Sequence, residues 1–100
     1  MKYGLEDSII EQIQSVFKRH SEIKKVVLYG SRAKGNYRVN SDIDLTLVGD
    51  NINHTLINDV SWQLDDLLLP YTFDISNFYN IRHADLLEHI ERVGVDFYTS

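Results

Sequence analysis

Three short apolar runs constrain the fold of this sequence more than any other feature. The runs are rich in β-branched and aromatic side chains and are too short for helices, so each is predicted to be a strand. They are residues 24–29, 42–48 and 71–76. Residues 55–68, between the second and third runs, carry apolar side chains at helical spacing. Strands joined by such a helix form a parallel pair with a right-handed crossover.

The remaining segments complete a mixed sheet. The turn at residues 30–35 is too short for a crossover, which favours an antiparallel pairing of the first two strands. Helices are predicted near residues 8–17, where Ser8 and Glu11 form a capping box, and near residues 83–93, with Gly94 as the C-cap. We therefore expect one α/β (α+β) domain, residues 1–100, with a three- to four-stranded mixed sheet and helices mainly on one face.

Composition excludes several classes of protein. The 100 residues contain no cysteine, which excludes a disulfide framework or a thiolate metal site. The formal net charge of −5 disfavours nucleic acid as a direct substrate, because affinity for phosphate backbones comes mainly from Lys and Arg. Neither a signal peptide nor a membrane span is visible, so a cytoplasmic protein is expected.

Alternation along the second and third predicted strands places aspartates together. Asp42 and Asp44 share one face of the second strand, and Asp74 lies on the corresponding face of the third. An isolated Asp-x-Asp is more often a solvated strand start, but a third aspartate of matching parity favours a site. Converging carboxylates repel one another, and Mg²⁺ relieves that repulsion.

The turn after the first strand offers a second group of candidate residues. Gly30 and Ser31 can present backbone N–H groups and a hydroxyl to a phosphate, and Arg32 and Lys34 add positive charge. Gly-Ser is also a common turn dipeptide, so alone the pattern is weak.

Together, Gly30-Ser31, ten residues, and Asp42-Ile43-Asp44 resemble the G-S-x10-D-x-D signature of DNA polymerase β-like nucleotidyltransferases. The predicted order of elements is similar to the family's palm-like core. The run GSRAKG and the small size are most similar to the minimal nucleotidyltransferases (MNT proteins), which are often encoded beside a helical HEPN-domain protein and act as antitoxins.

The resemblance implies a role for each matching residue. Asp42, Asp44 and Asp74 would be the catalytic and metal-binding residues for two Mg²⁺ ions, with Asp74 also the general base. Gly30, Ser31 and Arg32 would bind the triphosphate of ATP. The implied reaction is the transfer of AMP to a hydroxyl of a HEPN-type partner protein.

Alternative functions and a contact surface remain open. A non-catalytic antitoxin that acts by binding, or nucleotidyl transfer to a small molecule, would use the same core. Larger relatives carry an added helical domain that selects the acceptor. No segment here resembles it, so a partner or a second copy in a homodimer is expected to supply that function.

Trp62 lies opposite the apolar stripe of its predicted helix, so it either belongs to an interface or is covered by a local segment such as residues 95–98.

Overall fold

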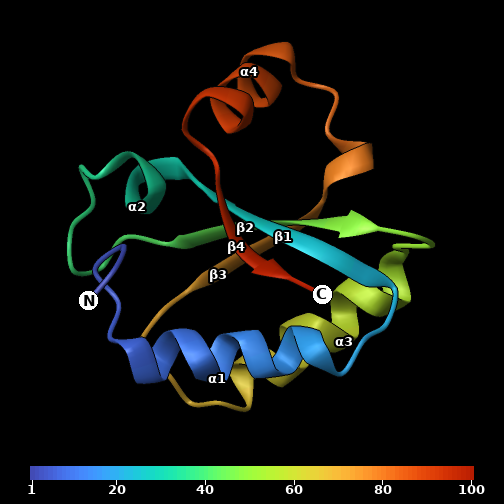
Figure 1. Ribbon diagram of the computed structural model, residues 1–100, viewed down its shortest axis with the longest axis horizontal. Coiled ribbons are helices and arrows are strands. Elements are labelled where there is room, and N and C mark those ends of the chain that lie inside the picture. Colours follow the sequence, from blue (N-terminus) through green and yellow to red (C-terminus); the bar gives the residue numbers. More distant parts are fainter.

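The computed structural model describes residues 1–100 and contains one four-stranded sheet, ordered β3-β2-β1-β4 (Figure 1). Its strands are β1 (Ile23–Tyr29), β2 (Ile43–Gly49), β3 (Phe73–Asn77) and β4 (Val95–Thr99). As predicted, β1 and β2 are antiparallel and β2 and β3 are parallel, so the sheet is mixed. β4, which the sequence suggested only as a covering tail, pairs antiparallel with the free edge of β1.

Helices lie on both sides of the sheet (Figure 1). The two longest, α1 (Asp7–Lys18) and α3 (His54–Asp65), cover one face. On the opposite side, α4 (Ala84–Val93) follows the 3-10 turn η1 (Phe78–Asn80), and the short α2 (Gly30–Lys34) begins where β1 ends. We call the side that carries α4 the α4 face of the sheet.

The main core lies between the sheet and the two long helices. Strand alternation directs Ile43, Leu45 and Leu47 of β2 into this core, where all three are fully buried, as the sequence predicted. Side chains of α1 and α3 pack against them at the spacing expected of amphipathic helices. On the α4 face a second cluster joins only three buried residues, namely Val27, Tyr29 and Ile90.

Several predicted helix ends differ from the structure. The proposed capping box at Ser8 is wrong: α1 begins at Asp7 after the N-cap Glu6, and no side chain caps it. The reason lies just before the helix, where fully buried Leu5 anchors the chain in the core. α3 ends three residues earlier than predicted, and Leu68 then takes a positive φ in the turn before Pro70.

Gly94 does occupy the C-cap position of α4, although not in the left-handed conformation common for glycine caps. Its extended backbone (φ −62°, ψ 143°) carries the chain directly from the helix into β4. None of the helices combines the length and apolar character needed to cross a membrane.

Candidate active site

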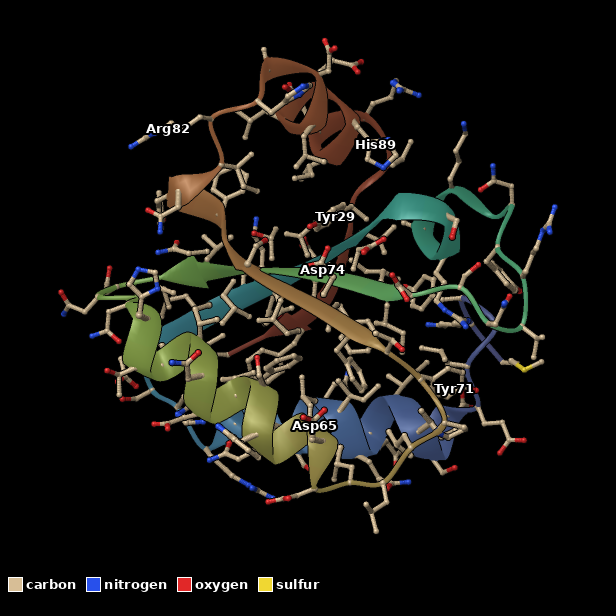
Figure 2. The ribbon with its side chains drawn as sticks, turned by 180° about the vertical axis from the view of Figure 1, so that it is seen from behind. Tyr29, Asp65, Tyr71, Asp74, Arg82 and His89 are labelled. Carbon is tan, nitrogen blue, oxygen red and sulfur yellow. The ribbon has the colours of Figure 1, made fainter.

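Asp44 and Asp74 are direct neighbours across β2 and β3. The parallel register pairs Asp44 with Asp74, between the pairs Ile43–Phe73 and Leu45–Ile75. Neighbouring strands lie about 4.8 Å apart, so the two carboxylates leave the sheet side by side on the same face. In Figure 2, Asp74 lies near Tyr29 on the α4 face, while Asp65 of α3 lies beyond the opposite face. The predicted juxtaposition of these two aspartates is present.

Burial and neighbouring negative charge perturb Asp44. Its pKa is raised from 3.8 to about 6, first by burial and then by the negative charges of Asp74 and Asp42. Asp42 is an exposed residue immediately before β2. The three aspartates therefore interact electrostatically, and the half-buried one bears the cost of their repulsion.

The donor set suits a hard cation. The structure holds no group of three His, Cys, Asp or Glu side chains already arranged as metal ligands. Asp44 and Asp74 nevertheless present two adjacent carboxylates whose repulsion a cation would relieve. Mg²⁺ typically takes one or two protein carboxylates and completes its shell with water and substrate phosphates. The residues present fit Mg²⁺ by their chemistry.

Gly30 links the two halves of the sequence signature. It begins α2 with φ +76°, a conformation that glycine adopts without strain. A Cβ at this position would overlap Oδ2 of Asp44. Tyr29, the preceding residue, is the register partner of Asp44. The Gly30-Ser31 turn is therefore packed directly against the aspartate, and Ser31 is only partly buried.

Arg32 takes a position different from the one that the sequence suggested. Its side chain is 2% exposed, and its guanidinium donates hydrogen bonds to the carbonyls of Tyr3 (2.9 Å), Ser41 (3.1 Å) and Val39 (3.3 Å). The guanidinium carbon also lies 5.5 Å and 5.1 Å from the ring centroids of Tyr37 and Tyr71.

With these contacts, each guanidinium nitrogen of Arg32 donates a hydrogen bond to a backbone carbonyl of this chain. It fixes the backbone of Ser41, the residue before Asp42, and thereby ties the start of β2 to the N-terminal segment. The other basic residue of the turn, Lys34, is exposed.

Two residues that sequence reasoning did not select also belong to this region: Tyr29 borders the aspartates, and His89 contacts Gly30. Tyr29 is 7% exposed, and burial raises the pKa of its hydroxyl above 10.0; the nearby Ser76 hydroxyl opposes the shift, and the charges of Asp74 and Asp44 add to it. His89 of α4 accepts a hydrogen bond from the Gly30 N–H (3.0 Å). These partners are 59 positions apart in the sequence, so no local spacing could have indicated their contact.

Comparisons with known proteins show what the chain is similar to. Residues 11–100 match the family model described as "Polymerase beta, Nucleotidyltransferase". A Methanocaldococcus jannaschii protein described as "Putative protein adenylyltransferase MJ0604" is 52% identical over 33 residues, a stretch that spans 33% of this chain and 33% of that relative.

Solved structures share the fold. One is a toxin-antitoxin complex with AMP-PNP (TM-score 0.73, 17% identity), in which the match covers 91% of this chain and 73% of the other. Another is a tri-AMPylated HEPN toxin from Shewanella oneidensis in complex with MNT antitoxin (TM-score 0.69, 13% identity). That match covers 96% of this chain and 74% of the other. Because the family model matches nearly the whole chain, the chain belongs to the polymerase beta nucleotidyltransferase family.

Proposed function

We propose that this domain transfers AMP from ATP to a hydroxyl group of a HEPN-type partner protein, as the antitoxin of a toxin–antitoxin pair. The observation that carries the proposal is the contact of the Gly30-Ser31 turn with Asp44, beside Asp74 on the next strand. The relatives support the choice of nucleotide and acceptor, since they include an AMP-PNP complex and a tri-AMPylated HEPN toxin. ATP as the substrate would place the reaction in the cytoplasm.

The proposed roles are those that the family resemblance implies, and the positions of the residues are consistent with them. Asp42 and Asp44 would hold two Mg²⁺ ions, with Asp74 completing the cation site. Gly30 and Ser31 would bind the β- and γ-phosphates, next to the carboxylate of Asp44. Bound Mg²⁺ would supply charge stabilisation for the nucleophile and the leaving pyrophosphate. Arg32 would act indirectly, by fixing the backbone that leads to Asp42.

The chemical step is a displacement at the α-phosphorus of ATP. The acceptor oxygen forms a bond to this phosphorus while the bond to the β-phosphate bridging oxygen breaks, and pyrophosphate leaves. Asp74 would take the proton of the acceptor hydroxyl, since it is exposed and points out of the same face as Asp44. A tyrosine hydroxyl of the partner is the expected acceptor.

The test is mass spectrometry of a HEPN-type partner after incubation with this protein, ATP and Mg²⁺. We expect a mass increase of one or more AMP groups and the release of pyrophosphate, both abolished by EDTA. Asp74→Asn should prevent modification. Asp50→Asn should not, although it changes the charge equally, because Asp50 follows the C-terminal end of β2 and the site lies at the start of that strand. A partner that stays unmodified but is neutralised equally well by Asp74→Asn would show that the protein acts by binding alone.

A further inference from the structure

His89 connects α4 to the signature turn. Its Nε2 accepts the hydrogen bond of the Gly30 N–H at 3.0 Å, so the neutral ring carries its proton on Nδ1. The imidazole also packs edge-on against the ring of Tyr29, with centroids 6.3 Å apart and an interplanar angle of 79°. Figure 2 shows His89 on α4, on the same side of the sheet as Tyr29 and Asp74.

α4 itself is held firmly on β1. Ile90, the residue after His89, is buried against Val27 and Tyr29. At the end of the helix the chain passes so close to β1 that a Cβ on Gly94 would lie 2.8 Å from Cγ1 of Val27. β4 then pairs with β1 immediately, beginning with Val95 opposite Leu28. These contacts fix the position from which His89 reaches the turn.

Gly30 is therefore constrained from two sides. His89 holds its N–H, while its α-carbon lies against the carboxylate of Asp44. We propose that His89 is a positioning residue that holds the Gly30-Ser31 turn against Asp44, so that binding of the nucleoside triphosphate depends on the seating of α4. The claim about nucleotide binding rests on the proposed function. The claim that His89 holds Gly30 in place does not, because it concerns only residues of this chain.

The same helix offers a matched control. His83, the N-cap of α4, also accepts a backbone N–H, that of Leu86, through Nδ1 at 3.3 Å. That bond is local and exposed, whereas the His89 bond joins the helix to the signature turn. Replacing either histidine removes one acceptor of a backbone N–H. Only replacement of His89 should disturb the turn.

Amide hydrogen exchange tests the structural part. In His89→Phe, which keeps an aromatic ring beside Tyr29, exchange at Gly30 should accelerate by about tenfold, as expected for one lost hydrogen bond. His83→Phe should leave the Gly30 amide unchanged. His89→Gln retains an acceptor and should restore part of the protection, and it also serves if the Phe variant folds poorly. Unchanged exchange at Gly30 in both His89 variants would overturn the inference.

Calorimetric titration with AMP-PNP and Mg²⁺ tests the functional part. We expect His89→Phe to weaken binding about tenfold and His83→Phe to weaken it less than twofold. Equal losses in the two variants would trace the effect to the stability of α4 and contradict a role at the turn. If wild type binds no AMP-PNP, the proposed function fails, while the exchange measurement still decides whether His89 holds Gly30.

Discussion

The two faces of the sheet are built differently although they share the same strands. Toward α1 and α3, Leu45 and its neighbours join a continuous cluster of 14 buried residues. On the α4 face, the buried cluster has only three members. There, Asp44 is half-buried and Thr46 donates a long hydrogen bond to the Ser76 carbonyl (3.4 Å). An open pocket of about 430 Å³, lined partly by Val48 and Phe78, also lies beside the contact of α4 with β1.

We expect this difference to separate stability from the proposed function along a single strand. Burial of apolar area supplies most of the folding free energy, so the α1–α3 face sets the stability of the domain. The α4 face can hold half-buried charge because the opposite face offsets its cost. Substitutions on the two faces should therefore have different consequences, and each prediction below contrasts one position with a matched one.

The largest effects are expected at two consecutive residues of β2. Leu45→Ala should lower the free energy of unfolding by about 2–5 kcal/mol, because it leaves a cavity in a fully buried site. Asp44→Asn should leave the protein folded but reduce AMP transfer at least about 10³-fold, because it removes charge from a concerted arrangement. Urea denaturation and a transfer assay measure the two quantities. The idea that the two faces determine different properties would be contradicted if Asp44→Asn unfolded, or if its loss of AMP transfer were matched by a loss of stability.

Arg32 should show the next largest effect, on stability. Arg32→Met leaves three backbone carbonyls without their donor and should cost about 3 kcal/mol. Arg32→Lys should recover little, because an ammonium cannot reproduce the planar set of donors. Lys34→Met, an exposed change of the same charge on the same short helix, should cost less than about 0.5 kcal/mol. A stable Arg32→Met protein with weakened triphosphate binding would instead support direct contact of Arg32 with phosphate.

The pH dependence of stability should reveal the strain at Asp44. The raised pKa, about 6 against 3.8, means that the folded state binds the proton more tightly than the unfolded state. The contribution of this group to stability is therefore full below pH 4 and lost as the pH rises to about 6. In EDTA, Asp44→Asn should exceed wild type in stability above pH 6 by about 1 kcal/mol, a value discounted for partial solvent exposure.

Urea denaturation of both proteins between pH 4 and 7.5 would measure this difference. It should shrink as the pH falls, and added Mg²⁺ should stabilise wild type more than the variant. If the difference in stability between wild type and Asp44→Asn stays the same at all these pH values, Asp44 is not strained.

How far the sequence predicts this molecule depends on how local each feature is. Alternation alone assigned Leu45 and Asp44 to opposite faces, since strand geometry fixes that relation. The family signature placed Gly30 and Asp44 in one site, but their direct contact was not predicted. The burial of Arg32 was not predicted, because its three acceptors include Tyr3, which lies 29 residues away.

Features that depend on tertiary packing were not predictable. The hydrogen bond between Gly30 and His89 exists only because α4 is seated on β1. β4 is a strand because the edge of β1 is available, and its five residues carry too little periodicity to reveal this from sequence. The roles in binding and catalysis remain predictions for all of the candidate residues, namely Gly30, Ser31, Arg32, Asp42, Asp44 and Asp74.

The smallest effect on stability is expected at Trp62, where α3 repeats the contrast between two faces. Trp62 is 70% exposed and is not covered by residues 95–98, which form β4, whereas Leu64 lies in the core at 1% exposure. Trp62→Ala should change the free energy of unfolding by less than about 0.5 kcal/mol, and Leu64→Ala should lower it by about 2–5 kcal/mol.

If Trp62 belongs to an interface, its removal should weaken self-association or partner binding about tenfold, because exposed tryptophans often dominate contact energies. Thermal melts and sedimentation at several concentrations, with and without a HEPN-type partner, would separate these quantities. A loss of stability approaching that of Leu64→Ala, with association unchanged, would place Trp62 among the residues that hold the fold and remove it from any interface.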